Sequence, residues 1–211
     1  MQLYPAQVVK QPDLVLAMHW QSHAFTPEQK ARKVDYYERR TVRDSSLSSC
    51  TSAVMCAEVG HLELAHAYTK EAAMVDLRDL HSNTADGVHM ASLAGAWIAL
   101  VAGFGGLRED EHTLSLNPQL PEGISHLVFN LRWRQSRLRA DVRHTHVRYT
   151  LRDGPDRELT IRHAGQPVTL NTSNPSEFEL SPCRPALSAP PQPPGRAPQW
   201  IDQRLPSAAP R

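Results

Sequence analysis

The chain has 211 residues, enough for one domain or two small ones. Hydrophobic residues make up 40% of it, and 23 basic against 22 acidic residues give a net charge of +1. This composition excludes collagen-like chains, disulfide scaffolds and fully disordered chains. The even charge balance also argues against a protein built as a whole to bind nucleic acid or a membrane surface.

The cysteine count and the hydropathy pattern indicate the compartment. Three cysteines, Cys50, Cys56 and Cys183, cannot form a disulfide framework, and an odd number suits a reducing environment. The N-terminus lacks the basic and apolar regions of a signal peptide. No apolar run approaches the ~18 residues of a membrane span. The sequence therefore predicts a cytoplasmic protein with no membrane partner.

Residues 1–112 have the pattern of a helical domain. The segment Thr26-Pro27-Glu28-Gln29 is a variant of the capping box, and it predicts a helix that runs to about Arg39. A second N-cap at Asp44-Ser45-Ser46 predicts a helix of small residues that ends at Gly60.

Two more helices are expected in this domain. Residues 61–80 have near-helical apolar spacing and should form an αα-hairpin with the preceding helix. Residues 83–87 indicate a turn, and residues 88–104 form an apolar, alanine-rich helix. Helices that are apolar on nearly all sides are buried on more than one side, as in a helical barrel or a large bundle.

The period changes to two after residue 112. Apolar and polar residues alternate over residues 127–133, 138–142, 147–151 and 159–161, and Asp153-Gly154 indicates a hairpin turn. This pattern predicts a small antiparallel β domain over residues 113–180, with one buried face. Residues 181–211 hold most of the chain's proline-rich sequence and are expected to be disordered. The fold class is therefore α+β, with a helical domain, a β domain and a tail.

Three segments could carry chemistry. Ser45 and Ser46 offer hydroxyl donors at an expected helix start, where free N–H groups attract anions, although the motif by itself favours plain N-capping. His89 falls in the first turn of another expected helix and could donate to an anion or serve a structural hydrogen bond. Lys10 and Gln11 are long donors that could bind a ligand or mark an exposed boundary.

These segments together resemble glycoside hydrolase family 65, which includes maltose, kojibiose, nigerose and trehalose phosphorylases and some acid trehalases. The resemblance covers roughly residues 8–160 and keeps the order of six separated motifs. The motifs are Lys10-Gln11, Thr26-Pro27-Glu28-Gln29, Asp35-Tyr36-Tyr37-Glu38, Asp44-Ser45-Ser46-Leu47-Ser48, Asn83-Thr84-Ala85-Asp86-Gly87-Val88-His89 and Ser92-Leu93-Ala94-Gly95-Ala96-Trp97, followed downstream by Leu114-Ser115-Leu116-Asn117-Pro118-Gln119-Leu120-Pro121.

The resemblance implies the C-terminal helices of an (α/α)6 barrel followed by a small β-sandwich-like domain. It also implies an inverting phosphorolysis, in which inorganic phosphate attacks an α-glucosyl disaccharide and yields glucose 1-phosphate. By this resemblance Ser45, Ser46 and His89 hold the phosphate, and Lys10 and Gln11 bind hydroxyls of the glucosyl unit. Phosphate is a co-substrate, and no cofactor is implied.

The family's general acid lies in a Gly-Pro-Asp-Glu-like segment that has no counterpart here, so no catalytic residue is assigned. The chain is therefore expected to be the C-terminal part of such an enzyme, inactive alone unless a missing N-terminal segment or a second copy completes it. Three alternatives remain open: part of a trehalase-type hydrolase with Asp44 as its carboxylate, a non-catalytic sugar-phosphate-binding module, and a remnant without function.

Two further signals receive a structural interpretation. Arginines alternate with the apolar residues from Arg132 to Arg152, which indicates a solvated strand face and no nucleic-acid partner. His144 and His146 lack a third ligand nearby, so no metal site is expected. The aromatic residues Trp97, Trp133 and Tyr149 are expected in the core.

Overall fold

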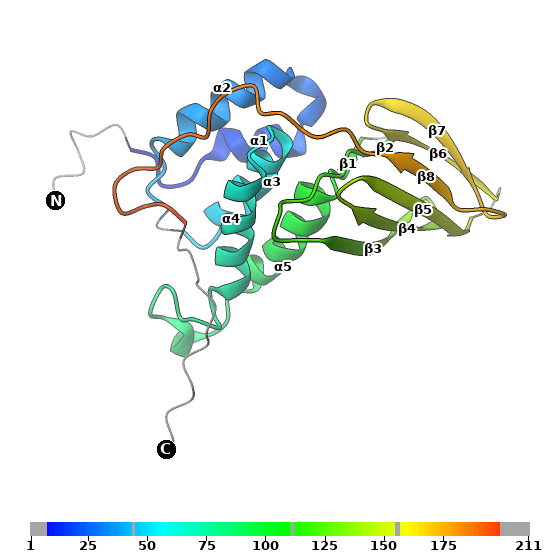
Figure 1. Ribbon diagram of the computed structural model, residues 1–211. Helices are drawn as coiled ribbons and strands as arrows, with labels where there is room; N and C mark the ends of the chain where they lie inside the picture. The colour runs from blue at the N-terminus through cyan, green and yellow to red at the C-terminus, as the bar shows by residue number, and fades with distance from the viewer. Residues whose placement is uncertain (1–7, 44, 111, 155–156, 199–211) are drawn as a thin grey trace.

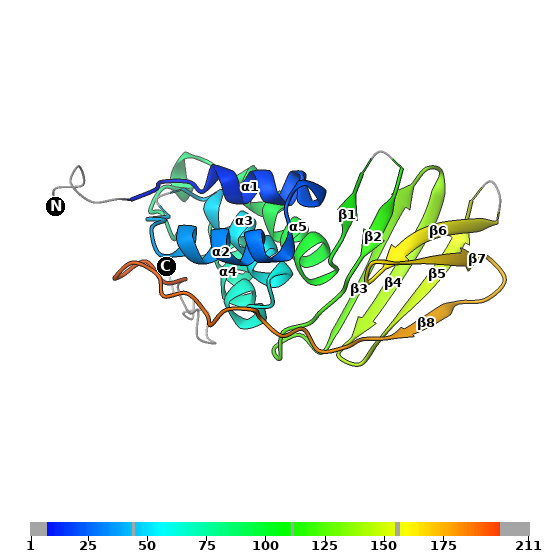
Figure 2. The ribbon, with the colours of Figure 1, turned by 90° about the horizontal axis from the view of Figure 1, so that it is seen from above.

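The computed structural model describes residues 8–43, 45–110, 112–154 and 157–198. The molecule has two units, a group of helices and a pair of β-sheets, which lie side by side (Figure 1). Figure 2 shows the same two units from above, with β1 and β2 nearest to the helices. The chain is thus a mixture of helices and largely antiparallel sheets, as the sequence predicts.

In the part of the chain that the structure describes, five α-helices form the first unit, and α5 continues without a break into a wider π-helical stretch over residues 99–104. Their bounds are α1 Asp13–Trp20, α2 Pro27–Glu38, α3 Ser48–Glu58, α4 Leu62–Met74 and α5 Met90–Ile98. The expected capping box is present, because the Thr26 side chain accepts from the Gln29 N–H and the Gln29 side chain accepts from the Thr26 N–H. The α3–α4 hairpin is also confirmed.

The predicted start of α3 is wrong by several residues. The helix begins at Ser48, and its N-cap position is Leu47, whose side chain caps nothing. Ser45 and Ser46 lie in the turn before the helix, and Asp44 lies outside the described residues. The turn is closed locally, since the Ser48 N–H donates to the Ser45 carbonyl at 3.1 Å. This local bond delays the helix by about one turn.

The described residues include eight strands in two four-stranded sheets, in the orders β1-β2-β6-β7 and β3-β4-β5-β8. The strands are β1 Arg108–Glu109, β2 Leu114–Leu116, β3 His126–Trp133, β4 Ser136–Arg143, β5 His146–Asp153, β6 Glu158–His163, β7 Gln166–Asn171 and β8 Ser176–Glu179. The inner residues of both sheets join one core with the helices, as expected for strands with one buried face.

Two details of the predicted β domain are wrong. The pairing of β2 with β6 is parallel, which the long connection through β3, β4 and β5 permits. Asp153-Gly154 does not close a hairpin, because β5 pairs with β4 and β8 whereas β6 pairs with β2 and β7. The chain changes sheets there. β1 lies within the range 1–112 that the sequence pattern assigns to the helical domain.

α3 is the central helix of the first unit and packs against α1, α2, α4 and α5. Its residues from Ser48 to Ala57 are buried, except for the half-buried Cys50. Gly95 of α5 allows this close packing, because a Cβ there would lie 2.6 Å from the Cβ of Cys50. Small side chains on α3 thus set the distance between the helices.

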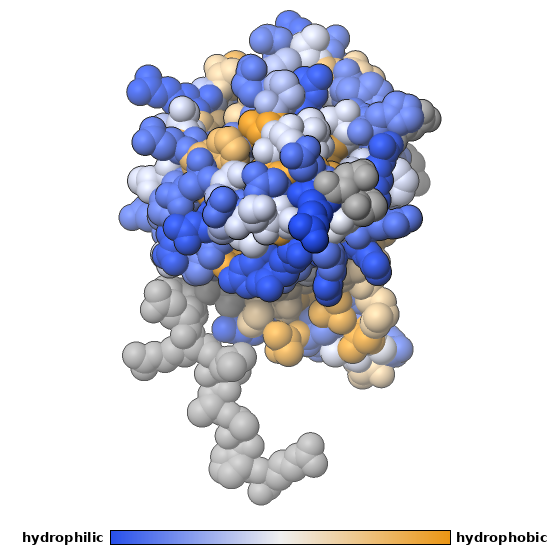
Figure 3. Space-filling model, turned by 90° about the vertical axis from the view of Figure 1, so that its right-hand side faces the viewer, coloured by the Kyte–Doolittle hydropathy of each residue, from blue (hydrophilic) through white to orange (hydrophobic). Residues whose placement is uncertain are grey.

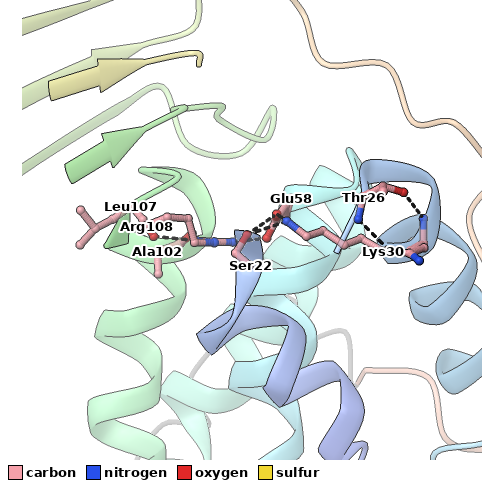
Figure 4. Close-up of polar contacts among 8 residues, drawn as sticks. Ser22, Thr26, Lys30, Glu58, Ala102, Leu107 and Arg108 are labelled. Atoms are coloured by element: carbon pink, nitrogen blue, oxygen red, sulfur yellow. Dashed lines mark hydrogen bonds and ion pairs between the residues drawn. The ribbon is translucent and has the colours of Figure 1, made fainter. Parts of the chain in front are cut away.

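A buried ionic cluster joins the helices to the sheets (Figure 4). Lys30 of α2 donates to one carboxylate oxygen of Glu58 at 2.5 Å, and Arg108 of β1 donates to the other. The hydroxyl of Ser22 binds both Lys30 and Glu58. Burial raises the pKa of Glu58, but Arg108 and Lys30 outweigh burial and hold it below its usual value. Burial and Arg108 lower the pKa of the neighbouring His19 to about 4, so this imidazole is neutral at pH 7.

The expected disordered tail is wrong for the part that the structure describes. Residues 181–198 have no helix or strand, but they run back along the helices as a strap (Figure 1). Gln192 donates to the buried carboxylate of Glu38 at 3.4 Å, and Arg43 donates to a carbonyl near the end of the strap. The strap therefore packs on the helical unit, despite its proline-rich sequence.

The surface is mostly polar, with an apolar region on the helical unit. Seen from the side of the sheets, hydrophilic groups dominate, and hydrophobic groups gather at the lower edge, below the sheets (Figure 3). The arginines of the outer strand faces are mostly exposed, as expected. The prediction that three aromatic residues lie in the core is wrong for Trp97, which is 56% exposed on α5. Tyr149 is buried, and Trp133 packs against the core. Among the described residues, no helix is both long and apolar enough to cross a membrane.

The ionic cluster predicts a large effect of a small substitution. Glu58→Gln leaves Lys30 and Arg108 without their carboxylate, so the free energy of unfolding should fall by about 3 kcal/mol. Glu177→Gln, at an exposed pair with Arg148, should cost less than ~1 kcal/mol and is the control. Urea denaturation measures both variants.

The pH dependence of the same stability has a defined sign. Because the pKa of Glu58 is lowered on folding, its contribution is present above the unfolded pKa of ~4.3 and is lost as the pH falls through the folded pKa. Glu58→Gln should remove this part of the acid destabilisation. An unchanged acid profile in the variant would contradict the assignment.

Candidate functional site

The two chain segments that carry Gln11 and Ser45 are held together by the backbone. Val9 and Thr41 form a parallel bridge, and the N–H of Val42 donates to the carbonyl of Val9 at 2.8 Å. This places Gln11 beside the turn before α3, where its Nε2 donates to the Ser45 hydroxyl at 2.6 Å. The structure thus brings together two residues, 34 positions apart, that the sequence singles out.

The turn before α3 offers polar groups at the start of the helix. The Ser45 hydroxyl also accepts from the N–H of Leu47 at 3.3 Å, and Ser46 follows in the same turn, half-buried. Within the described residues no side chain caps α3, although the first N–H of the helix, that of Ser48, already donates to the Ser45 carbonyl. The site therefore combines hydroxyls with the positive end of a helix dipole, although the serines precede the helix and do not cap it.

Ser48 is a candidate that the sequence analysis did not single out. Its side chain is buried, and its hydroxyl has no hydrogen-bond partner within the described ranges. It borders a small pocket of about 100 Å³ that Gln11, Pro12 and Thr51 also line. A buried hydroxyl without a partner is costly, and a bound ligand or water would satisfy it. The residue type alone carries no such signal, because a serine in a helix is ordinarily satisfied by its own backbone.

His89 is held by an aspartate that the sequence pattern did not reveal. The imidazole Nδ1 lies 2.6 Å from Asp76 Oδ1, and the His89 N–H donates to Asp76 Oδ2 at 2.8 Å. The hydrogen bond from the His89 side chain is the main reason why the pKa of Asp76 lies below its usual value. One oxygen of this carboxylate thus holds the ring and the other holds the backbone, and within the described residues Nε2 makes no hydrogen bond.

The N-termini of α3 and α5 lie on the same side of the helical unit. Gly95 lies against Cys50, and further along the chain Gly103 lies against Val54 and Ala57, so the two helices run in parallel. Their N-terminal ends are therefore neighbours. Ser45 and Ser46 precede one of these ends, and His89 precedes the other.

Lys10 is exposed beside Gln11. The described residues provide no hydrogen bond or ion pair for its ammonium group. The Val9 backbone bonds hold this segment against residues 40–42, so Lys10 lies at the same end of the helices as Gln11.

The buried Glu38 and the half-buried Glu58 are both held by protein side chains. Burial raises the pKa of Glu38, whose carboxylate accepts from the hydroxyls of Ser52 and Tyr68 at 2.9 and 2.5 Å. Glu58 is neutralised by Lys30 and Arg108. A general acid must reach the oxygen that it protonates, and these carboxyl groups are enclosed by their own partners. Over the described ranges, moreover, no group of three or more residues could hold a metal ion.

Two family models match the sequence. Residues 1–98 match the central catalytic domain of glycosyl hydrolase family 65, and residues 107–170 match the C-terminal domain of the same family. The two matches meet near the joint between the helices and the sheets. Together they cover most of the chain.

Several known proteins are similar to this chain. A protein of Mycobacterium leprae described as an uncharacterized glycosyl hydrolase is 71% identical over 93% of the chain and 25% of its own length. The α,α-trehalose phosphorylase of Geobacillus stearothermophilus is 39% identical over 85% of the chain and 23% of its length. The kojibiose phosphorylase of Halothermothrix orenii is 34% identical over 80% of the chain and 22% of its own length. The chain thus spans about a quarter of the length of the curated relatives it matches.

A solved structure has the same fold. It is provisionally assigned as a kojibiose phosphorylase from the human microbiome, and it superposes with a TM-score of 0.78 at 29% identity. The match covers 84% of this chain and 26% of that one. Both family models and the similar phosphorylases agree, and the chain belongs to glycosyl hydrolase family 65.

Proposed function

We propose that this chain forms the phosphate side of the active site of an inverting phosphorylase, which cleaves an α-glucosyl disaccharide to glucose 1-phosphate and a free sugar. The observation that carries the proposal is the 2.6 Å contact between Gln11 and Ser45. It joins a residue proposed to bind the glucosyl unit to one proposed to bind phosphate. The trehalose and kojibiose phosphorylases among the relatives support the same reaction class.

In this proposal the anion sits between two helix ends. Ser45 and Ser46 donate hydroxyl hydrogens from the start of α3, and His89 donates from its Nε2 at the start of α5. Helix dipoles and uncapped N–H groups stabilise a phosphate at such a place. Lys10 and Gln11 bind hydroxyls of the glucosyl ring, which positions the anomeric carbon beside the phosphate.

The reaction balances without a cofactor. A phosphate oxygen forms a bond to the anomeric carbon as the glycosidic C–O bond breaks, and the leaving oxygen takes a proton from a carboxylic acid. We place this acid in the part of the relatives that the chain does not match, and the helices of this unit within an (α/α)6 barrel. Proton transfer of this kind contributes ~10²–10⁴-fold to such a rate, so the chain alone should be inactive.

Calorimetric titration with inorganic phosphate tests the anion site. Ser46→Ala and His89→Ala should each weaken phosphate binding about tenfold, because each removes a hydrogen bond to a charged group, worth ~1.5–3 kcal/mol. Ser173→Ala and His144→Ala, both at exposed positions of the β domain, are the matched controls and should leave binding unchanged. If the wild type, the two site variants and the two controls all bind phosphate equally well, Ser46 and His89 are not phosphate ligands.

Asp76 should affect the affinity for phosphate indirectly, by orienting His89. Asp76→Asn preserves the size of the side chain but loses the charged oxygen that orients the imidazole. We expect phosphate binding to weaken roughly threefold to tenfold. In the His89→Ala background the same substitution should have no further effect, and an additive loss would show that Asp76 acts independently.

Turnover separates the phosphorylase from its alternatives. The purified chain, incubated with phosphate and maltose, trehalose or kojibiose, should release no glucose 1-phosphate. Release of glucose 1-phosphate would show that the chain carries its own general acid. Release of glucose without phosphate would instead identify a trehalase-type hydrolase. Phosphate binding without turnover, in a complete protein as well, would identify a non-catalytic binding module.

A further inference from the structure

A second pocket lies between the helices and the sheets. Its volume is about 820 Å³, and it is lined by Trp20, Gln21, His23, Glu109 and Asp110. Trp20 is the last residue of α1, and Glu109 ends β1. Figure 2 shows the C-terminal end of α1 beside β1, so the pocket opens at the joint of the two units.

This pocket is separate from the candidate phosphate site. α1 begins at Asp13, next to Gln11 and thus next to the turn of Ser45. Its eight residues span roughly 12 Å before Trp20 is reached. The end of α3 that lies nearest to Trp20 is its C-terminal end, since Ser22 binds Glu58. The two sites therefore lie at opposite ends of the helical unit.

Trp20 forms the apolar wall of the pocket. Its side chain is 72% exposed, whereas Val15 and Met18 of the same helix are buried in the core. A large aromatic ring is rarely left so open, because its burial contributes more hydrophobic free energy than that of almost any other side chain. The indole therefore presents a flat apolar face to whatever occupies the pocket.

Polar groups also line the pocket, and one of them, Asp110, is held in place by hydrogen bonds. The N–H groups of His112 and Thr113 donate to Asp110 at 2.9 and 2.7 Å, and these bonds lower the pKa of Asp110 and hold it ionised. Across the described residues, the side chains of Gln21 and Glu109 have no hydrogen-bond or ionic partner. The pocket thus combines one aromatic face with an amide, an imidazole and two carboxyl groups.

We propose that this pocket binds a neutral pyranoside without acting on it. The C–H face of a pyranose ring packs against an indole, and carboxylates and amides accept and donate to adjacent hydroxyls. Glu109 and Asp110 would repel phosphate, which separates the ligand of this pocket from the ligand of the first site. The choice of an α-glucoside as the probe rests on the proposed function, whereas the pocket itself does not.

Titration of the whole chain with maltotriose, by calorimetry and by tryptophan fluorescence, tests the proposal. Trp20→Ala should weaken binding about tenfold or more, and Glu109→Gln by a few-fold. Trp97→Ala removes another exposed indole, on α5, and should leave binding unchanged. Far-UV circular dichroism and urea unfolding establish that each variant is folded.

The outcomes separate this pocket from the phosphate site. Maltotriose binding that survives Gln11→Ala and Ser46→Ala, but not Trp20→Ala, supports the second site whether or not the phosphorylase proposal holds. Binding that survives Trp20→Ala and is lost in Gln11→Ala places the sugar at the first site and overturns the inference. Absence of maltotriose binding, or binding of calcium ions alone through the two carboxylates, also overturns it.

Discussion

The arrangement of the two units depends on the carboxylate of Glu58. This carboxylate forms ion pairs with Lys30 of α2 and Arg108 of β1, and it lies at the end of the central helix α3. Removal of a charged group from water is expensive, so such a group persists only where its partners are held in place. The capping box that starts α2 places Lys30 one turn into the helix, and the core of the joint, with Gly105 against Phe129, holds β1 near α3. The ion cluster and the apolar packing therefore specify one docking geometry.

The two ends of the helical unit carry different kinds of polar groups. At one end are the hydroxyls of the turn before α3 and the imidazole before α5, both at helix starts that attract anions. At the other end are Glu58 of α3, the carboxylates of Glu109 and Asp110 at the end of β1, and an exposed indole. Parallel packing of α3 and α5 produces the first cluster, since it brings two helix starts to one place.

Much of the architecture could be predicted from local patterns. The Thr26–Gln29 cap and the alternation of apolar residues in the strands are signals written within a few neighbouring residues, and both are confirmed. The start of α3 could not be predicted, because the bond from the Ser48 N–H to the Ser45 carbonyl, which closes the preceding turn, has no signal in the residue types. Asp153-Gly154 was mistaken for a hairpin because a turn motif does not say which strands pair across it. For the site, motif order singled out Gln11 and Ser45, whereas Asp76 and Ser48 emerge only when distant segments meet.

The strap of residues 181–198 gives the fold an unusual order of assembly. Its bonds to Glu38 and Arg43 join positions more than 150 residues apart, among the longest sequence separations in the molecule. Helices and hairpins close over short loops and form early, whereas a segment tied over such a distance docks after both units are in place. A few polar bonds hold it, so it is also the part that opens first in the native state. Amide exchange along the helices beneath the strap would therefore follow its opening and closing, and the completed core would exchange more slowly.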